Sequence, residues 1–390
     1  MSADESAEKR KWIRLTRACN NHCIFCLDEE AKNGTFLPFK TVLENLEEGF
    51  KNGCKRAVLS GGDPSIHPDF HKIVKAAKDT GYRHIQAITN GRMFCYPEFI
   101  VKAVQNGLSE ITFSIHAPEP QLNDMLTGAK GSFIQSITAL RNALRIPGLT
   151  VNCDIVVNAL NVDILAKHLR FLYSLGVREF DILHIMPFGL AWRNWDRLYY
   201  DPFAKKKELF SAFQLAENKE VHLWTNRFPA DLFEGNEHLI QSPFKLLDEV
   251  RGRKTVFENF RKGIPMECAG KRCSFCPLRN FCSDLKELIN KQDCIKAFSM
   301  PECLGGRKIN KKIYADAPLE DIAAFYIEYR HFIKSSHCAR CTFNSSCKGA
   351  SVLFLKEKGF AVLSPVVAGT EADTEKRSVE NAVPQEQINR

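Results

Sequence analysis

The 390-residue sequence lacks any run of roughly 18 apolar residues, the length that a membrane-spanning helix requires, and no charged-then-apolar leader opens it. We therefore expect a cytoplasmic protein with no membrane partner. The net charge of +8 is not gathered into a long block of one sign. Short basic stretches such as 307–312 could contact RNA or an acidic peptide, but runs of this kind are usually solvated loops, so we do not expect a nucleic-acid partner.

Cysteine, in contrast, is abundant, with 15 residues in the chain. Disulfides explain them poorly, because reducing compartments disfavour disulfides and a chain of this length can build a sizeable core without them. Metal ligation explains them better, since most of them lie in three tight groups. Cys54, Cys95 and Cys153 stand alone in predicted elements and are interpreted as inert thiols.

The first group is the stretch from Cys19 to Cys26, which has the spacing C-x3-C-x2-C directly after a short apolar strand. A cubane iron-sulfur cluster normally takes four cysteine ligands, so three cysteines on one loop leave one iron open to a ligand that is not protein. Spacing alone leaves a zinc loop or an accidental trio of thiols as the alternative.

This stretch resembles the hallmark of the radical S-adenosylmethionine (SAM) superfamily, including the aromatic residue before the last cysteine, here Phe25. The resemblance implies that Cys19, Cys23 and Cys26 hold a 4Fe-4S cluster whose open iron binds SAM beside Phe25. It also implies that the reduced cluster cleaves SAM to a 5'-deoxyadenosyl radical, which abstracts hydrogen from a substrate.

Strand-like and helical patterns alternate six times between residues 12 and 190, which predicts an α/β fold with a parallel sheet and right-handed crossovers. The resemblance implies that this sheet is the partial (β/α)6 barrel of radical SAM enzymes. Ligands of such folds bind beyond the carboxyl ends of the strands. The predicted strands are 12–16, 57–60, 84–89, 111–115, 151–157 and 180–185, and the predicted helices are 38–52, 69–80, 96–106, 133–146 and 163–175.

Candidate SAM contacts follow the predicted strands. Gly61, Gly62 and Asp63 come after the second strand, where glycines allow a backbone to approach a ligand closely and a carboxylate complements a positive charge. The family pattern is G-G-E-P, so Asp63 replaces a glutamate. The resemblance further implies that Asn90, Ser114 and Met186, at the ends of the third, fourth and sixth strands, contact SAM.

Beyond about residue 263 the composition changes to a loop-rich stretch with many cysteines. Two groups share the spacing C-x2-C-x5-C, and the second resembles the SPASM and twitch auxiliary-cluster extensions of radical SAM enzymes. The further cysteine of the family pattern, three residues later, is absent from both groups. The candidate metal ligands in this stretch are Cys268, Cys273, Cys276, Cys282, Cys294, Cys303, Cys338, Cys341 and Cys347.

Two assignments of these cysteines remain open. In the first, two auxiliary clusters use 268/273/276/282 and 338/341/347, the latter completed by Cys294 or Cys303. In the second, one group holds a cluster and the other holds zinc, which accepts four cysteines equally well. We favour an iron-sulfur cluster in at least one group.

The sequence thus predicts a radical SAM core followed by a small cysteine-rich domain. The predicted segments are a disordered start (1–10), the core (11–200), a bridge (201–262), a SPASM-like domain (263–360) and a disordered tail (369–390). We predict a radical SAM enzyme that modifies a peptide or a small metabolite and takes electrons from a reductant such as flavodoxin or ferredoxin. The alternative is a non-catalytic iron-sulfur or zinc protein that acts as a redox carrier or sensor.

Overall fold

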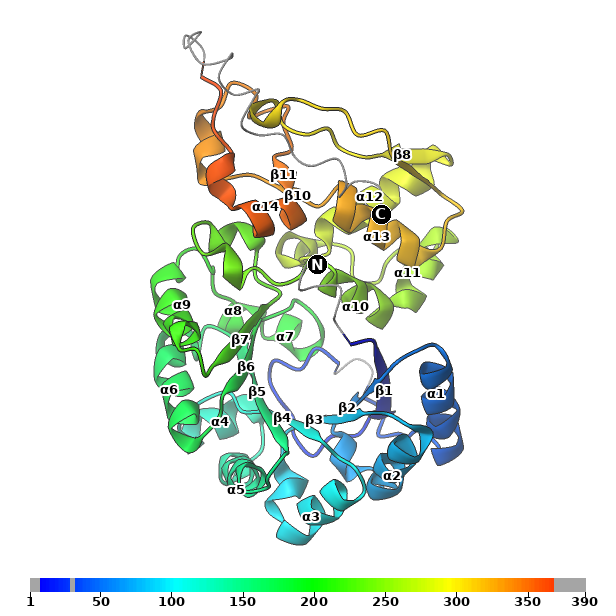
Figure 1. The fold of residues 1–390 in the computed structure, drawn as a ribbon, viewed down its shortest axis with the longest axis vertical. Coiled ribbons are helices and arrows are strands. Elements are labelled where there is room, and N and C mark those ends of the chain that lie inside the picture. Colours follow the sequence, from blue (N-terminus) through cyan, green and yellow to red (C-terminus); the bar gives the residue numbers. More distant parts are fainter. Residues whose placement is uncertain (1–7, 29–31, 368–390) are drawn as a thin grey trace. The chain divides into compact units, whose positions relative to one another are not determined.

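The computed structural model describes residues 8–28 and 32–367. It divides into two compact units, Met1–Arg227 and Phe228–Arg390, which are described separately below (Figure 1). The predicted disordered tail and most of the predicted disordered start lie outside the described residues. Within 8–10, Glu8 forms ion pairs with Arg56 (3.0 Å) and His84 (2.6 Å), and Arg10 begins the first strand.

The first unit is built on a seven-stranded parallel sheet whose strands follow one another in chain order. This arrangement confirms the predicted α/β class and the parallel sheet. The seventh strand lies within the segment predicted as a bridge (201–262), so the sheet has one strand more than the six predicted units. The strands are β1 (Arg10–Thr16), β2 (Arg56–Gly61), β3 (His84–Thr89), β4 (Glu110–Ser114), β5 (Thr150–Val157), β6 (Glu179–His184) and β7 (His222–Asn226).

Helices connect the strands. In Figure 1 the sheet curves, with α1, α2, α3, α5 and α6 outside the curve and the segment that follows β1 inside it. The predicted helices agree with the observed ones within about two residues. The helix α4 was not predicted, because it has only eight residues between Pro120 at its start and left-handed Gly128 at its end. The helices are α1 (Phe39–Lys51), α2 (Phe70–Thr80), α3 (Pro97–Gln105), α4 (Pro120–Thr127), α5 (Ser132–Leu144), α6 (Leu165–Leu175), α7 (Gly189–Arg193), α8 (Trp195–Leu198) and α9 (Lys206–Phe213).

Alternation along the strands gives the sheet two different faces. On β4, Ile111 and Phe113 are fully buried, and Phe113 contacts the ring of Phe94 in the η3 turn (Arg92–Cys95). The neighbouring positions carry buried polar side chains that bond across strands. Gln86 donates to Thr112 (2.8 Å), and Asn152 donates to Glu110 (2.7 Å).

This polar network occupies the amino-terminal half of the sheet. Arg56 on β2 completes it through an ion pair with Glu110. Because the buried donors and acceptors there bond mainly to one another, they stabilise the fold and leave ligand binding to the carboxyl ends of the strands.

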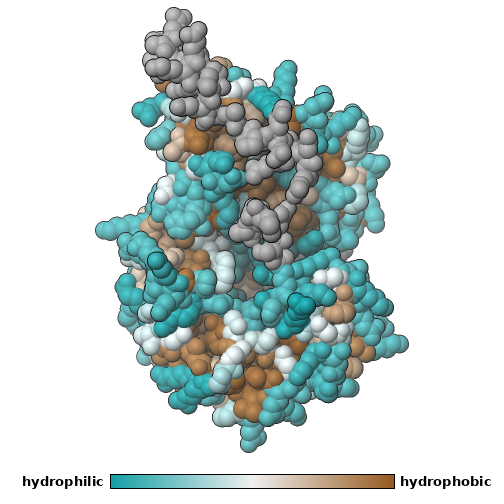
Figure 2. Space-filling model, viewed as in Figure 1, coloured by the Kyte–Doolittle hydropathy of each residue, from teal (hydrophilic) through white to brown (hydrophobic). Residues whose placement is uncertain are grey.

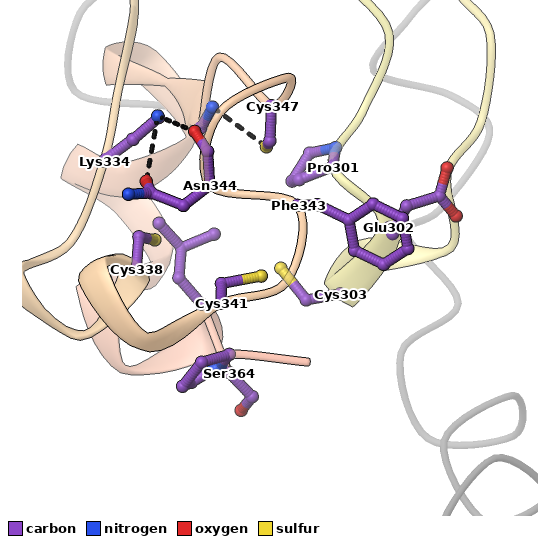
Figure 3. Close-up of a pocket in the computed structure, with 13 residues that line it drawn as sticks. Pro301, Glu302, Cys303, Lys334, Cys338, Cys341, Phe343, Asn344, Cys347 and Ser364 are labelled. Atoms are coloured by element: carbon purple, nitrogen blue, oxygen red, sulfur yellow. Dashed lines mark hydrogen bonds between the residues drawn. The ribbon is translucent and has the colours of Figure 1, made fainter. Parts of the chain in front are cut away.

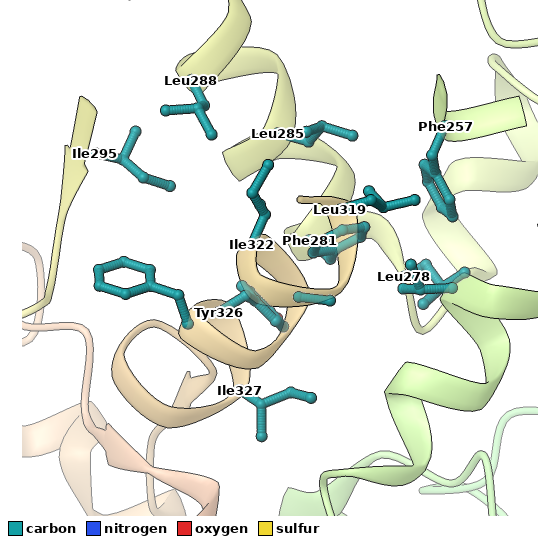
Figure 4. Close-up of a cluster of buried hydrophobic side chains, with 13 residues drawn as sticks. Phe257, Leu278, Phe281, Leu285, Leu288, Ile295, Leu319, Ile322, Tyr326 and Ile327 are labelled. Carbon is teal, nitrogen blue, oxygen red and sulfur yellow. The ribbon is translucent and has the colours of Figure 1, made fainter. Parts of the chain in front are cut away.

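The second unit is a small helical domain with two short antiparallel strand pairs, β8 with β9 and β10 with β11. Its core lies between α12 and α13, where Phe281 packs edge-on against Phe257 and Tyr326, and Leu285 and Ile322 are buried (Figure 4). The elements are α10 (Lys245–Gly252), α11 (Lys254–Arg261), α12 (Arg279–Lys291), β8 (Cys294–Lys296), β9 (Lys312–Tyr314), α13 (Leu319–Tyr329), β10 (Phe332–Ile333), β11 (Ala350–Ser351) and α14 (Val352–Lys358).

Hydrophilic side chains cover most of the face seen in Figure 2, with apolar patches between them. Across residues 8–28 and 32–367, none of the helices combines the length and the apolar character that crossing a membrane demands.

Candidate metal centres

The three cysteines of the first group lie on the connection between β1 and α1. Figure 1 shows the segment that follows β1 inside the curve of the sheet. Burial raises the pKa of Cys19 and Cys23 above the ordinary thiol value, and for Cys23 the nearby Cys19 and Cys26 raise the pKa further. Cys19 and Cys26 therefore lie close enough to Cys23 to oppose its ionisation. A bound metal cation would reverse this effect by stabilising the thiolates.

The glycine turn after β2 packs directly against the start of the cysteine loop. Gly62 donates its N–H to the carbonyl of Thr16 (2.9 Å), and Asp63 donates its N–H to the carbonyl of Ala18 (2.9 Å). A Cβ atom on Gly61 would overlap the Thr16 carbonyl, and one on Gly62 would overlap the Ala18 carbonyl. These glycines therefore allow close approach to the loop that carries Cys19.

The end of α4 holds the middle of the same loop. His22 and Ile24 donate their N–H groups to the carbonyls of Thr127 and Leu126, each at 2.9 Å. Gly128 ends α4 in the left-handed conformation, and a Cβ atom there would overlap the carbonyl of His22. The loop backbone is thus paired with a segment a hundred residues away in sequence.

The connection after β6 holds the last part of the loop. Leu190 donates its N–H to the carbonyl of Cys26 (2.8 Å), and the Asn194 side chain donates to the carbonyl of Ile24 (2.9 Å). A Cβ atom on Gly189 would press on the Cys26 carbonyl. The sequence did not predict that Gly128, Gly189 and Asn194 contact the cysteine loop, although each follows a strand or helix end at the expected edge.

The Asp63 carboxylate, predicted as a cofactor contact, is fully buried and turned toward the end of β3. It accepts hydrogen bonds from the Thr89 hydroxyl (2.8 Å), the Asn90 N–H (2.8 Å) and the Ser65 N–H (2.9 Å). Burial raises its pKa, although these hydrogen bonds oppose the rise. In this structure Asp63 joins the turn after β2 to the end of β3.

The Asn90 side chain, also predicted as a SAM contact, bonds to the cysteine loop. Its Nδ2 donates to Asn20 Oδ1 (2.6 Å) and lies 3.8 Å from the Cys19 sulfur. Arg92, two residues later, donates to the Asn20 carbonyl and to Asn21 Oδ1 (3.2 Å). No sequence motif pointed to Arg92.

The other predicted SAM contacts lie at the same edge of the sheet. Ser114 is half-buried at the end of β4, and Met186 is buried two residues after β6. Phe25 is buried and packs edge-on against the His116 ring at 4.6 Å. His116 itself accepts from the Val156 N–H, and burial lowers its pKa to about 3, so it is neutral at pH 7.

In the second unit, the first cysteine group surrounds the η8 turn (Lys271–Phe275) and the start of α12. Burial raises the pKa of Cys282 to about 12, and the nearby Cys276, Cys268 and Cys273 raise it as well. Cys276 and Cys282 also pack against the hydrophobic core of this unit. These four thiols therefore lie together.

The second group of this unit lines a pocket (Figure 3). Cys303 comes from the η9 turn (Glu302–Leu304), Cys338 from the η10 turn (Ser336–Arg340), and Cys341 and Cys347 from the loop that follows. Burial raises the pKa of Cys303, and the nearby Cys338, Cys347 and Cys341 raise it further. Figure 3 shows the sulfurs of Cys303 and Cys341 turned toward each other.

Cys294 lies apart from this pocket, on β8, with its thiol 3.7 Å from the Asp293 carboxylate. Of the two cysteines considered as the fourth member of the 338/341/347 group, the structure thus brings Cys303 to it. All fifteen cysteines are free thiols.

The donor sets fit iron-sulfur clusters: three thiols in the first unit and two sets of four in the second. Within the part of the chain that the structure describes, no three Cys, His, Asp or Glu side chains converge as closely as a single metal ion would require. Each cysteine of a cluster instead binds a separate iron.

The parallel sheet and the cysteine loop at its carboxyl edge define a class, α/β proteins with a cluster of thiols at the ends of the strands. Residues 13–172 match the family model described as the radical SAM superfamily. Domains of this family use a 4Fe-4S cluster and SAM.

Relatives in sequence include two archaeal proteins, each named probable GTP 3',8-cyclase. The protein of Saccharolobus islandicus is 29% identical over 206 residues, which cover 50% of this chain and 66% of that protein. The protein of Saccharolobus solfataricus is 30% identical over 180 residues, which cover 46% of this chain and 58% of that protein. The chain thus spans just under two thirds of the length of the relatives that it matches.

Solved structures that resemble parts of this chain include Streptococcus suis SuiB bound to the precursor peptide SuiA. That similarity has a TM-score of 0.49 at 15% identity and covers 90% of this chain and 74% of SuiB. The FeFe-hydrogenase maturase HydG of Carboxydothermus hydrogenoformans has a TM-score of 0.45 at 12% identity, covering 57% of this chain and 55% of HydG.

Proposed function

We propose that the protein is a radical SAM enzyme. The observation that carries the proposal is the cysteine loop, which places three thiols at the carboxyl edge of a parallel sheet and is held by hydrogen bonds from β2, α4 and the segment after β6. A fixed loop with three thiolate donors suits a cluster whose remaining iron binds a small molecule.

Cys19, Cys23 and Cys26 would hold the cluster. When bound, the reduced cluster would supply the electron that cleaves SAM to methionine and a 5'-deoxyadenosyl radical. The protein's own part is to fix the three sulfurs, to shield the site and to orient the bound molecules. Phe25 and Met186 are buried beside this edge, where apolar side chains exclude water.

We propose Gly61, Gly62, Ser114, Met186 and Phe25 as the residues nearest to SAM. Their support is their shared position at the carboxyl ends of β2, β4 and β6 or on the cysteine loop itself. Asp63 and Asn90 would act on SAM indirectly, because their side chains are bonded to the turn, the strand end and the loop.

We propose two auxiliary iron-sulfur clusters in the second unit, as in SPASM-type enzymes. One would use Cys268, Cys273, Cys276 and Cys282, and the other Cys303, Cys338, Cys341 and Cys347. Their support is the proximity of four thiols in each group. Four cysteines complete the coordination of a cubane, so these clusters would transfer electrons or stabilise the fold without binding substrate.

The substrate class that we propose is a peptide or a small metabolite. The archaeal relatives are named for GTP, which is a small metabolite, and SuiB was solved with a bound precursor peptide. The electron donor would be a flavodoxin or a ferredoxin in a reducing compartment such as the cytoplasm, where free thiols persist.

The test is an anaerobic assay of the reconstituted full chain with SAM and a strong reductant, with 5'-deoxyadenosine as the product measured. The proposal predicts product from the wild type and from Cys54→Ala, a buried cysteine outside the three groups, and none from Cys23→Ala. A fully iron-loaded wild type that forms no 5'-deoxyadenosine would contradict the proposal and favour a redox carrier or sensor.

A further inference from the structure

The segment Asn90 to Arg92, directly after β3, forms a clamp on the turn that contains Cys19. The Asn90 carbonyl accepts a hydrogen bond from the Ser136 hydroxyl (2.6 Å). The Asn90 backbone N–H donates to the Asp63 carboxylate (2.8 Å). Its side-chain Oδ1 accepts from the Arg92 N–H (3.0 Å). Every polar group of Asn90 except the side-chain Nδ2 therefore helps to fix where Asn90 lies and how its amide is turned.

The fixed amide presents its Nδ2 to the cysteine loop. That nitrogen donates to Asn20 Oδ1 at 2.6 Å and reaches the Cys19 sulfur at 3.8 Å. The Asn21 N–H reaches the same sulfur at 3.4 Å. Cys19 thus has two N–H groups directed at its sulfur.

Arg92 adds a positive charge at the same turn. Its guanidinium donates to the Asn20 carbonyl and to Asn21 Oδ1 (3.2 Å), while Nε is anchored on Gln135 (2.6 Å). Asn90 and Arg92 therefore each bond to the turn that contains Cys19, through separate side chains.

Hydrogen-bond donors that are directed at a sulfur ligand change the reduction potential of an iron-sulfur cluster. Reduction adds negative charge, which delocalises onto the sulfur ligands, and N–H donors stabilise that charge more in the reduced state than in the oxidised state. Hydrogen bonds to the sulfurs are among the factors that set cluster potentials.

We propose that Asn90 is a positioning residue that raises the reduction potential of the cluster at Cys19, Cys23 and Cys26 by donating its side-chain N–H to the Cys19 sulfur. This inference rests on the proposed function, because it needs a cluster at those cysteines. It gives Asn90 a role on the cluster in place of the direct SAM contact that the sequence predicted.

The experiment is a redox titration of the reconstituted full chain, followed by electron paramagnetic resonance. The signal of this cluster is the one that changes when SAM is added and that is absent from Cys23→Ala. Asn90→Ala removes both hydrogen bonds that the side-chain Nδ2 donates. We expect the midpoint reduction potential of the cluster to be more negative in this variant. At a fixed potential, the ratio of reduced to oxidised cluster should fall about threefold.

The matched control is Asn218→Ala. Asn218 has the same pair of bonds, with Oδ1 accepting from the Glu220 N–H (3.0 Å) and Nδ2 donating to the Tyr173 hydroxyl (3.0 Å), but away from the cysteine loop. The midpoint reduction potential of the cluster in Asn218→Ala should equal that in the wild type. Asn90→Asp keeps the acceptor of the turn and the size of the side chain but has no N–H, so it should shift the midpoint in the same direction even if Asn90→Ala fails to load iron.

The outcomes separate the two claims. A SAM-responsive signal with an unchanged midpoint in the Asn90 variants would overturn the role of Asn90 and leave the proposed function standing. Failure to find any SAM-responsive signal in iron-loaded wild type would overturn both. A negative shift in the Asn90 variants, without a shift in Asn218→Ala, would establish the inference.

Discussion

The cysteine loop of the first unit and the cysteine groups of the second unit are held in different ways. Loop residues 16 to 26 bond to partners far along the chain, from Gly62 to Asn194. The backbone bonds of the second unit's groups mostly join residues close in sequence, such as Cys341 to Cys338 in a turn and Cys282 to Leu278 at the start of α12. The first site is therefore shaped by the fold around it, whereas the loops that carry Cys303, Cys338, Cys341 and Cys347 would need a bound metal to fix them.

Removal of the metal should show the largest difference between the cysteine loop of the first unit and the cysteine groups of the second. Without iron, the stretch 299–349 should lose stability on the order of 10 kcal/mol, the scale of structural metal sites, while residues 16–27 keep their hydrogen bonds. Hydrogen exchange, compared between iron-free and reconstituted protein, measures both segments in one experiment. Equal loss of protection in the two segments would contradict the comparison.

Acid should affect the first unit more than the second. Burial lowers the pKa of His116 to about 3 and those of His168 and His184 to about 4 in the first unit, and that of His331 to about 4 in the second. Below pH 6.5 the unfolded chain binds protons at these sites that the folded chain does not. Stability should therefore fall as the pH decreases from 7 to 5, by about 2 kcal/mol for each histidine.

The iron-free protein is suited to this measurement because all four tryptophans lie in the first unit. Tryptophan fluorescence in urea titrations at pH 7 and pH 5 reports on that unit alone. An unchanged midpoint between the two pH values would show that the buried histidines do not have depressed pKa values.

Two glycines allow the stability cost of a left-handed backbone conformation to be distinguished from the cost of overlap with the cysteine loop. Gly128 and Gly131 both have positive φ, but only Gly128 faces the loop, at the His22 carbonyl, whereas Gly131 has open space around it. Both alanine variants should lose about 1 kcal/mol through the left-handed conformation. Gly128→Ala should lose about 2 kcal/mol more from the overlap, together with iron at the first site.

Urea titration and an iron count check this prediction. Similar losses in the two variants would mean that α4 does not support the loop as closely as the structure indicates.

The smallest effect concerns the departure from the family's glycine motif. Asp63 is fully buried and its carboxylate is already bonded to Ser65, Thr89 and Asn90. Asp63→Glu should therefore destabilise the first unit by about 1 to 3 kcal/mol through overpacking, although it restores the family residue. The control is Asp28→Glu, at a partly exposed carboxylate paired with Arg14. A more stable Asp63→Glu variant would contradict this account.

The sequence predicted the first unit well because its signals are local. The spacing of apolar residues gave the strands and helices to within two residues, and the C-x3-C-x2-C spacing located the loop. Local patterns cannot show which distant groups meet, so Arg92 and the contacts of Gly128, Gly189 and Asn194 were missed. For the same reason the choice between Cys294 and Cys303 stayed open until the fold brought Cys303 beside Cys338.

The predicted roles of Asp63 and Asn90 show a related difference. Both residues lie at the predicted edge of the sheet, but their side chains bond to protein groups there. A motif identifies the residues near a site without showing which of them touch the ligand and which hold the residues that do.

The most direct measurement of the central claim is the iron content and SAM response of Cys23→Ala beside the wild type. Three clusters correspond to about twelve irons per chain. We predict that Cys23→Ala loses about a third of this iron, loses the spectral change on addition of SAM, and keeps the remaining clusters. Loss of all iron, or a SAM response that persists without Cys23, would contradict separate sites with SAM bound at the first.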